Sequence, residues 1–439
     1  MTVQYAELGR TATALAVGIE RAIVEGALAP GDLLPTVRTL SREAGVSPTT
    51  AAAAYRTLRQ RGLVATHGRN GTTVSPRPPL AGSFDSAPAA ALRNLAGGNP
   101  DVALLADLRT VLHRLEPTPQ LYGGVGNRPS LLARAADLFA HDGIPAQHLA
   151  ITGGALDGIE RALQAHLRPG DRIAVEDPGY PPLFDLLAAL GLVPEPIALD
   201  AYGLRPDALA PRLGHVAAVL VTPRAQNPTG AALDAARAAA LSDLFDAHPD
   251  LLVLEDDHAG PVAGAAAFTT AHPGRRRWAT LRSMSKPLAP DLRLAFVAGD
   301  ALTIARIEGR QRLGTGWVSH LLQQVVEMLL ADPATPDLWH KAARSYARRR
   351  RAVIDALIGH GIEATGDSGL NVWVPVPAEA PAVAGMAAAG WAIQAGERFR
   401  HRSPAAVRLT VAGMAEDEAP AVAAALAQLL AAPRRRSLA

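Results

Sequence analysis

GIERAIVEGALAPGDLLPTVRTLSREAGVSPTTAAAAYRTLRQRGLVATHGRNGTTV, residues 18–74, is the stretch that decides the fold of the first part of this chain. Apolar residues recur near helical spacing over residues 11–29, which predicts a first helix. Pro30–Gly31 follows and ends that helix, because proline and glycine together favour a turn. The chain is therefore predicted to begin with an amphipathic helix.

Two further helices are predicted from their capping residues. Thr36 is the candidate N-cap of a helix that Gly45 closes, and Ser47 is the candidate N-cap of the next one. Pro48 then occupies the first helical position, where a missing N–H costs nothing. This third helix is expected to run to about Gln60.

A β-hairpin is predicted after the helices. Two short strand patterns, Leu63–Thr66 and Thr72–Ser75, flank a turn rich in glycine and asparagine. Three helices followed by a hairpin form a winged helix-turn-helix. We assign residues 1–77 to this domain, residues 78–94, rich in Pro, Ala and Ser, to a linker, and residues 95–439 to a second domain.

Charge divides the chain at the same place. Residues 1–77 carry nine arginines, no lysine and five acidic residues, a net charge of +4, whereas the remainder carries 34 basic and 36 acidic side chains. A basic small segment joined to a near-neutral large one indicates a nucleic-acid-binding module attached to a domain with another task.

Lysine is rare in this chain. Only Lys286 and Lys341 occur, although Lys and Arg together number 43. Arginine cannot replace a lysine whose amine must form a Schiff base. A lysine that persists in such a background is therefore a candidate for amine chemistry.

Other compositional features limit the class of protein. There is no cysteine, which excludes disulfides and thiolate metal ligands, and we expect no metal site. The chain contains no run of about 18 apolar residues, so no membrane span is predicted. The first residues lack the pattern of an export signal. A cytoplasmic location is expected.

The second domain shows an α/β pattern. Apolar strand-like runs alternate with helices rich in Ala and Leu, which predicts a mostly parallel sheet covered by helices; these runs are Arg172–Val175, Ala217–Val221 and Leu251–Leu254. Residues 345–439 combine a helix, the shorter strands Leu370–Val374 and Ala406–Thr410, and a final helix, which predicts a smaller α+β subdomain.

The N-terminal stretch resembles the GntR-type winged helix, since PGDLLPTVRTL, VSPTTAAAAYRTL and GLV…GRNGTTV match it in order. A recognition helix places its first turns in the major groove. The resemblance implies that DNA is contacted by helix-entry, recognition-helix and wing residues, namely Arg38, Ser47, Thr49, Thr50, Arg56, Arg69 and Asn70. A solvated arginine surface is the alternative reading for these basic residues.

The second domain resembles fold-type I (class I) aminotransferases, which bind pyridoxal 5′-phosphate (PLP). Ser283-Met284-Ser285-Lys286, followed by Arg293, resembles the lysine motif of that family. The resemblance implies that Lys286 is the catalytic residue and carries the cofactor as an internal aldimine. It implies that Ser283 and Arg293 hold the phosphate, for which Arg offers a bidentate fork.

Two loops extend the same resemblance. Thr152-Gly153-Gly154-Ala155-Leu156 lies between a strand and a helix, so that the backbone N–H groups of Ala155 and Leu156 would bind the phosphate. Asn227, in an Asn-Pro-Thr-Gly sequence after a strand, would bond the phenolic oxygen of the cofactor. Each loop is also compatible with an ordinary turn.

The sequence Leu254-Glu255-Asp256-Asp257 ends a predicted buried strand. The resemblance implies that Asp256, with Asp257 as second choice, pairs with the pyridine nitrogen. The family commonly places a tyrosine shortly afterwards, where this chain has His258. A histidine with a pKa near neutrality would make the site pH-sensitive.

Three more residues complete the matched set. Tyr180, in Asp-Pro-Gly-Tyr, matches the aromatic residue that stacks on the cofactor ring, and Tyr122 resembles the tyrosine that reaches the phosphate of a neighbouring subunit. Arg408 falls where the family holds a substrate carboxylate. A core tyrosine and a strand-edge arginine are the structural alternatives for Tyr180 and Arg408.

A GntR-type winged helix joined to an aminotransferase-like domain resembles the MocR/GabR group of regulators over nearly the whole chain. The resemblance implies a PLP-bound, head-to-tail homodimer that binds promoter DNA. It also implies that an amino compound or a B6 vitamer, reacting at Lys286, changes DNA affinity. Two other functions stay open: a working aminotransferase with an accessory DNA-binding domain, and a DNA-binding protein whose large domain is a dimerisation scaffold.

Overall fold

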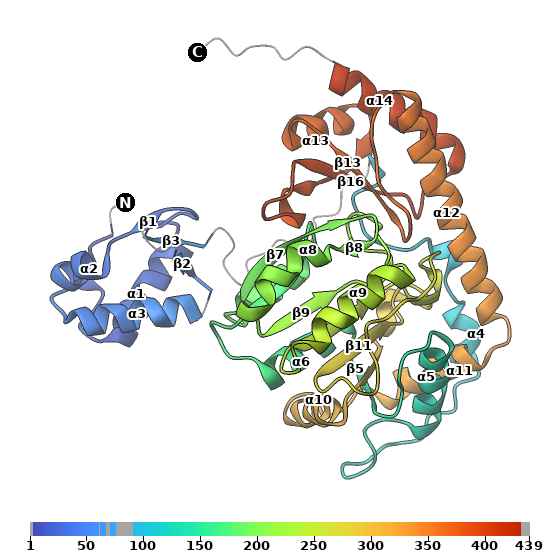
Figure 1. Ribbon diagram of the computed structural model, residues 1–439, viewed down its shortest axis with the longest axis horizontal. Coiled ribbons are helices and arrows are strands. Elements are labelled where there is room, and N and C mark those ends of the chain that lie inside the picture. Colours follow the sequence, from blue (N-terminus) through green and yellow to red (C-terminus); the bar gives the residue numbers. More distant parts are fainter. Residues whose placement is uncertain (1–2, 61, 67–70, 76–90, 432–439) are drawn as a thin grey trace. The chain divides into compact units, whose positions relative to one another are not determined.

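The computed structural model describes residues 3–60, 62–66, 71–75 and 91–431. Residues 3–75 form a winged helix domain of three helices and three short strands (Figure 1). Its elements are η1 (Tyr5–Glu7), α1 (Ala12–Val24), β1 (Leu33–Leu34), α2 (Val37–Glu43), α3 (Pro48–Gln60), β2 (Val64–Thr66) and β3 (Thr72–Val74). The order of the sheet is β1-β3-β2, so the predicted hairpin gains a third strand. Strand β1 is two residues long, which is too short to show a sequence period.

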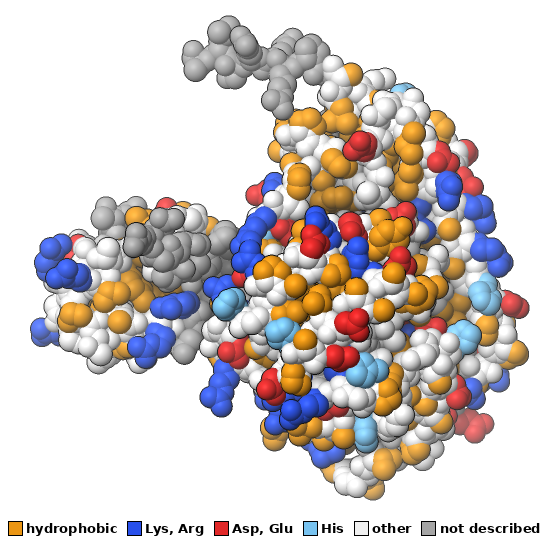
Figure 2. Space-filling view, viewed as in Figure 1, with side chains coloured by type: hydrophobic (Ala, Val, Ile, Leu, Met, Phe, Trp, Pro, Cys, Tyr) orange, Lys and Arg blue, Asp and Glu red, His pale blue; other side chains and the backbone are white. Residues whose placement is uncertain are grey.

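The predicted caps of this domain are confirmed. The Thr36 hydroxyl accepts the N–H of Thr39 at 3.2 Å, and the Ser47 hydroxyl accepts the N–H of Thr50 at 3.1 Å. Leu15, Ile19, Leu40 and Leu58 are fully buried between the helices, and Tyr55 donates its hydroxyl to the carbonyl of Pro35 at 2.6 Å. Figure 2 shows arginine side chains, in blue, on the visible face of this domain.

The large domain is built on an eight-stranded sheet with the order β5-β12-β11-β10-β9-β6-β7-β8. The strands are β5 (Leu149–Thr152), β6 (Arg172–Asp177), β7 (Val193–Asp200), β8 (Gly203–Leu204), β9 (Ala218–Val221), β10 (Leu252–Asp257), β11 (Trp278–Ser283) and β12 (Ala295–Gly299). The central strands β6, β9, β10 and β11 pair in parallel, as predicted, whereas β12 is antiparallel to both of its neighbours. Apart from β7, the strands of this sheet are almost wholly buried, because helices cover it.

Most helices of the large domain pack around this sheet (Figure 1). They are α4 (Leu108–His113), α5 (Pro129–His141), α6 (Ala155–His166), α7 (Pro181–Ala189), α8 (Pro206–Leu209), α9 (Ala235–Asp246), α10 (Ala301–Leu313) and α11 (His320–Ala331). Short 3-10 turns connect some elements: η3 (Val102–Leu104), η4 (Ala210–His215), η5 (Gly260–Val262) and η6 (Pro290–Leu292).

The predicted smaller subdomain is present at the C-terminal end. Its antiparallel sheet has the order β13-β16-β15, and it packs with the second half of the long helix α12. Its elements are α12 (Thr335–Gly359), β13 (Asn371–Pro375), α13 (Glu379–Ala388), β14 (Trp391–Ala392), β15 (Gln394–Ala395), η7 (Gly396–Phe399), β16 (Ala406–Thr410), η8 (Glu416–Glu418) and α14 (Ala419–Ala431). Strand β4 (Arg93–Asn94) pairs with β14, so residues just before 95 also belong to this subdomain.

None of the helices in the described part of the chain is both long and apolar enough to cross a membrane.

The Tyr55 hydroxyl gives a test of the winged helix core. We expect Tyr55→Phe to lower the unfolding free energy of this domain by about 1 kcal/mol, because the carbonyl of Pro35 loses its donor while the ring still packs. Urea denaturation followed by circular dichroism measures the change. Tyr202→Phe, at a half-exposed position of the large domain, is the matched control. An unchanged transition in Tyr55→Phe would show that the hydrogen bond contributes nothing.

Candidate functional site

The predicted cofactor residues come from loops that follow the central strands. Asp256 is the penultimate residue of β10, Asn227 follows β9, Lys286 follows β11 and Tyr180 follows β6. Ala155 begins α6 directly after β5 and two glycines. In open α/β sheets, ligands bind outside the carboxyl ends of the strands. The topology thus brings residues that are up to 131 positions apart, Ala155 and Lys286, to one edge of the sheet.

Lys286 lies partly buried next to Arg408. Its amine donates a hydrogen bond to the carbonyl of Gly98, and a Cβ placed on Gly98 would lie 3.9 Å from the Arg408 guanidinium. Burial, and then the charge of Arg408, lowers the pKa of Lys286 from 10.5 to about 8. A larger fraction of this amine is therefore neutral near physiological pH than is usual for lysine, and a neutral amine is the nucleophile that attacks an aldehyde.

Asp256 has a buried oxygen without a partner. Its carboxylate is 7% exposed, and no described residue donates a hydrogen bond to Oδ1. Burial, followed by the charges of Asp257 and Glu176, raises the pKa of Asp256 to about 7. A buried acceptor in this state is stabilised by an N–H donor, and most of all by a cationic one. The protonated nitrogen of a pyridine ring fits this requirement.

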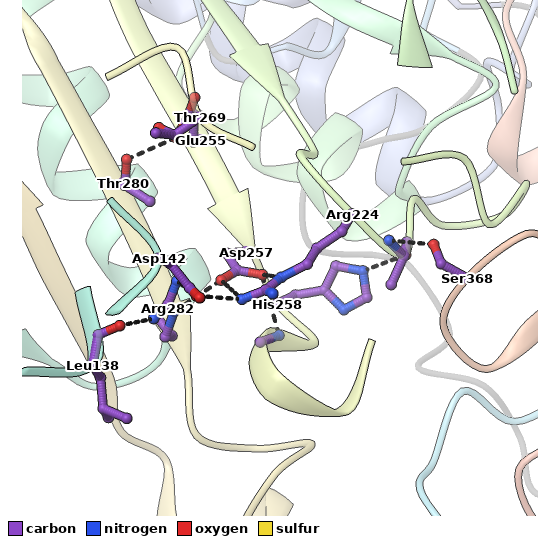
Figure 3. A network of polar contacts seen from close by, with 12 residues as sticks. Leu138, Asp142, Arg224, Glu255, Asp257, His258, Thr269, Thr280, Arg282 and Ser368 are labelled. Carbon is purple, nitrogen blue, oxygen red and sulfur yellow. Dashed lines mark hydrogen bonds and ion pairs between the residues drawn. The ribbon is translucent and has the colours of Figure 1, made fainter. Parts of the chain in front are cut away.

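Asp257, the second choice for that role, is already occupied by two arginines (Figure 3). Its oxygens accept from Nε and NH2 of Arg224, both at 2.9 Å, and from Nε of Arg282 at 2.8 Å. Both arginines also contact Asp142, at 2.9 and 2.7 Å. The charges of Arg224 and Arg282 hold the pKa of Asp257 far below its usual value despite burial. Adjacent residues of a strand face opposite sides, so Asp257 lies within this network while Asp256 faces away from it.

A cradle for an anion lies at the start of α6. Gly154 has a φ of +113°, and a Cβ at that position would lie 3.2 Å from the Arg293 guanidinium. The helix then begins at Ala155, so the first N–H groups of α6 lie next to this arginine, and free N–H groups at a helix start bind phosphate. Ser283 ends β11 nearby in the sheet, and its hydroxyl accepts the N–H of Ser285 at 3.2 Å. These groups fit a phosphate.

Backbone strain also concentrates here. Among the described residues other than glycine, only Ala225 and Arg293 have a positive φ, at 56° and 45°. Such conformations cost energy and collect at ligand sites, where the surrounding structure enforces them.

Arg408 and Asn227 are in direct contact. Asn227 Oδ1 accepts from NH1 of Arg408 at 3.1 Å and from Nδ2 of Asn371 at 3.3 Å. Arg408 lies on β16, is 4% exposed, and packs its guanidinium 4.8 Å from the centre of the Phe399 ring. A second hydrogen bond from Arg408 to the carbonyl of Ala96 orients the guanidinium. This is therefore a buried arginine of the site and not a strand-edge surface arginine.

The expectation that His258 has a pKa near neutrality is wrong. Burial, followed by the charge of Lys286, lowers the pKa of His258 to about 4. The ring is neutral near pH 7, and Nε2 lies 2.8 Å from the carbonyl of Ala225, which can only accept. Nε2 therefore carries the proton and Nδ1 is an acceptor, so His258 does not titrate in the neutral range.

The two tyrosines differ in their position. Tyr180 directly follows the Asp-Pro-Gly turn after β6 and is 36% exposed. Tyr122 is 95% exposed. Its ring packs against Trp317, which is not one of the predicted cofactor residues, with the ring centroids 5.8 Å apart.

The predicted DNA contacts divide into three groups. Thr49, Arg38 and Arg56 are exposed on α3 and α2. Ser47 and Thr50 bond each other at 2.8 Å and form the cap of α3. Arg69 and Asn70 lie outside the described residues.

Several residues that shape the site were missed from the sequence. The carbonyls of Ala96 and Gly98 accept hydrogen bonds from Arg408 and Lys286. The sequence Gly97-Gly98-Asn99-Pro100, which is typical of a turn, could have indicated this segment. The sequence did not predict the charge network of Arg224, Arg282 and Asp142, because these residues are far apart in the chain. The available signal was the arginine inside the apolar run Trp278–Ser283, since a buried arginine requires a buried anion.

Two family models match the chain. "Bacterial regulatory proteins, gntR family" covers residues 11–74, and "Aminotransferase class I and II" covers residues 92–426. The Salmonella typhimurium vitamin B6 salvage pathway transcriptional repressor PtsJ is 39% identical over 431 residues, which span 96% of this chain and 99% of PtsJ. This chain belongs to the MocR-type regulators of the GntR superfamily. Its members join the two domains described above, and PLP is the cofactor of the aminotransferase-like domain.

Other relatives agree with membership of the MocR-type family. The Corynebacterium glutamicum pyridoxine biosynthesis transcriptional regulator PdxR is 30% identical, covering 79% of this chain and 78% of PdxR. Among solved structures, a Thermococcus profundus multiple substrate aminotransferase superposes with a TM-score of 0.71 at 22% identity, covering 78% of this chain and 92% of that one. A Pyrococcus horikoshii kynurenine aminotransferase gives 0.70 at 23% identity, covering 78% and 91%. These structures establish the fold of the large domain.

The lowered pKa of Lys286 predicts where its amine becomes reactive. We expect the rate at which pyridoxal labels Lys286 in the cofactor-free chain to rise with pH and to reach half of its maximum near pH 8, since only the neutral amine attacks. Arg408→Met should move this midpoint upward, because a nearby positive charge is removed. Borohydride trapping followed by peptide mass spectrometry measures the label, with the exposed Lys341 as internal reference. A midpoint that stays near 10.5 would contradict the prediction.

The Asp257 network predicts a large loss of stability. Asp257→Asn should lower the unfolding free energy of the large domain by about 3–5 kcal/mol, because two buried guanidiniums lose a shared anion. Chemical denaturation of the cofactor-free chain, followed by tryptophan fluorescence, measures it. Asp207→Asn, in an exposed pair with Arg205, should leave the transition unchanged. Equal transitions for both variants would show that the network does not stabilise the domain.

Proposed function

We propose that this chain is a transcription regulator that senses a B6 vitamer through Lys286 and converts its occupancy into a change in DNA affinity. The observation that carries the proposal is the unpartnered, buried Oδ1 of Asp256 in a domain fused to a winged helix. The carboxylate needs a cationic N–H donor that the described chain does not provide. Bound PLP would supply that donor through its protonated ring nitrogen. The buried carboxylate of Asp256 would then have a partner.

The roles of the site residues follow from their chemistry. Lys286 would hold the cofactor covalently, Asp256 would pair with its ring nitrogen, and Tyr180 would cover the ring. When bound, PLP supplies an aldehyde that joins amines and a ring that withdraws electrons from the attached carbon. The phosphate would be held by N–H and side-chain donors, namely Ala155, Leu156, Ser283 and Arg293.

The phenolic oxygen of the cofactor would lie near Asn227 and His258. Because His258 Nδ1 is an acceptor, it would favour a protonated phenolic oxygen, where a tyrosine could donate instead. Arg408 would take the carboxylate of an amino acid that reaches the site. The exposed Tyr122 would reach the phosphate of the other protomer in a head-to-tail homodimer.

A B6 vitamer is the effector that the relatives favour over an amino acid. PtsJ is named as a repressor of vitamin B6 salvage and PdxR as a regulator of pyridoxine biosynthesis. The lowered pKa of Lys286 suits capture of free PLP near neutral pH. We extend the proposal to a cytoplasmic location and to a first domain that ends at residue 77, with the large domain beginning at β4.

DNA contact would come from the exposed side chains at the start of the recognition helix and before it. Thr49 would read base edges, while Arg38 would reach a base edge or a phosphate and Arg56 a phosphate. Ser47 and Thr50 cap α3 and would present their hydroxyls at the same helix end. Arg69 and Asn70 of the wing would contact the backbone.

Replacing Lys286 tests the sensor. Lys286→Ala should abolish the visible absorption that PLP shows when joined to a lysine, and should remove the effect of PLP on promoter affinity while keeping basal DNA binding. Fluorescence anisotropy with promoter DNA measures the second readout, and Lys341→Ala is the matched control. PLP-dependent affinity in Lys286→Ala would overturn the sensor. Steady turnover of an amino donor and a keto acceptor, with DNA affinity insensitive to PLP, would favour the aminotransferase.

Replacing Arg38 tests the DNA contact. We expect Arg38→Ala to weaken promoter binding roughly 5- to 150-fold, which corresponds to the loss of about 1–3 kcal/mol for a base-edge contact. If Arg38 contacts a phosphate, binding to all sequences weakens and the salt slope falls by about 1. Arg344→Ala, exposed on α12, is the control. Equal affinity of both variants would place Arg38 outside the interface.

A further inference from the structure

A cavity of about 720 Å³ lies within the large domain, apart from the cofactor residues. One wall is β7 together with α8 and η4, and the opposite wall is β13 and the loop 402–406 that leads into β16. None of the residues predicted to bind cofactor or effector lines it. Its volume is in the range of sites that take small organic ligands.

The walls of this cavity are mostly apolar. Prolines, alanines and one tryptophan dominate them, including Pro196, Ala198, Ala208, Trp373, Pro375 and Ala406. A surface of this kind favours an apolar body that leaves water.

Two arginines give the cavity a positive rim. Arg212 and Arg402 both line it, and their side chains are 48% and 63% exposed. Their nearest nitrogens lie 3.5 and 3.9 Å from the same oxygen of Glu195, so two positive charges share one buried carboxylate at distances beyond a good hydrogen bond. Figure 2 shows basic side chains at this boundary between the small subdomain and the region of β7 and α8.

The acidic residues of the wall are engaged elsewhere. Asp177 accepts the N–H groups of residues 401–403 at 2.7–3.1 Å and the Ser403 hydroxyl at 3.0 Å. Asp200 pairs with Arg237 at 2.9 Å. Asp367 lies near the charge of the buried Arg350, which also bonds its carbonyl. Among the residues that line the cavity, Arg212 and Arg402 are therefore the cationic hydrogen-bond donors that an anionic ligand would meet.

We propose that this cavity is a second ligand site, for a small amphipathic anion with an apolar ring or branched chain and one carboxylate or phosphate. The apolar body would lie against Trp373 and the prolines, and the anion would bind the guanidiniums of Arg212 and Arg402. Arginine forks match both carboxylate and phosphate.

The cavity wall is continuous with the cofactor site. Asp177 and Pro178 lie just before Tyr180, Thr229 lies two residues after Asn227, and Ala406 lies two residues before Arg408. A ligand in the cavity thus touches the outer side of segments whose next residues contact the cofactor.

Ser368 provides a direct link between the two sites. It follows the wall residue Asp367, accepts the N–H of Ala225 at 2.8 Å and donates to the carbonyl of Gly230 at 2.7 Å. The carbonyl of Ala225 in turn lies 2.8 Å from His258 Nε2; His258 and Ser368 are labelled in Figure 3. A Cβ placed on Gly369 would lie 2.7 Å from the Cβ of Ala225, so the contact has no free space to absorb a shift. In our proposal, these contacts pass a displacement at Asp367 to His258.

Binding is tested with 4-fluorophenylacetate as the probe, by fluorine NMR on the full chain loaded with PLP. We expect Arg402→Gln, and independently Ala198→Trp, which fills the cavity from an exposed wall position, to weaken probe binding at least tenfold. Arg408→Met should leave it unchanged, as should the control Arg344→Ala. Loss of binding in Arg408→Met with retention in the two cavity variants would place the probe at the effector carboxylate position and overturn the second site.

The link to the cofactor rests on the proposed function and needs its own readout. The probe should shift the pH profile of the PLP absorption in the wild-type chain, and Ser368→Ala should keep probe binding while losing that shift. Probe binding by Lys286→Ala shows the cavity site whether or not the sensor proposal holds. Probe binding without any change in absorption or DNA affinity in the wild-type chain would overturn the link, and a shift retained in Ser368→Ala would overturn the role of Ser368.

Discussion

The contact between Asp257 and the two guanidiniums of Arg224 and Arg282 is the interaction on which the cofactor site depends. It joins the ends of three neighbouring strands, and Asp142 ties the same arginines to the end of α5 (Figure 3). Buried charges are tolerated only when each is paired. The network therefore requires one register and one spacing of these strands, and that spacing places the side chains that face the cofactor.

Neighbouring carboxylates in this site behave in opposite ways because of what surrounds them. Both are buried, but Asp257 has two cations within hydrogen-bonding distance and keeps its charge, whereas burial, followed by two acidic neighbours, raises the pKa of Asp256 to about 7. Separation of pKa values within a small site is typical of functional residues. The cost of burying Asp256 without a partner would be offset by a cationic donor, which in the proposed function couples the stability of the large domain to cofactor occupancy.

The groups that would serve an aminotransferase are present in this regulator, so its use as a sensor follows from its fused DNA-binding domain and its relatives. His258 differs from the tyrosine common in the wider family and is a neutral acceptor held by the Ala225 carbonyl. The backbone that holds it continues through Ser368 to the cavity wall. The segments around Tyr180, Asn227 and Arg408 thus border the proposed cofactor site on one side and the cavity on the other. This arrangement suits a protein whose output is a change of conformation.

Local patterns in the sequence were enough for the winged helix, and they singled out Lys286 as the candidate anchor of the cofactor. The caps Thr36 and Ser47 and the hairpin depend on neighbours within a few residues, and Lys286 stands out because arginine replaces lysine almost everywhere else. The antiparallel strand β12, the charge network and the neutral state of His258 were decided by tertiary structure alone. Each depends on burial and on partners 12 or more residues away in the chain, and no local period records these. The sequence by itself therefore determined which domains are present, while the tertiary structure decided which buried side chains stay ionised, because burial and distant partners set their pKa values.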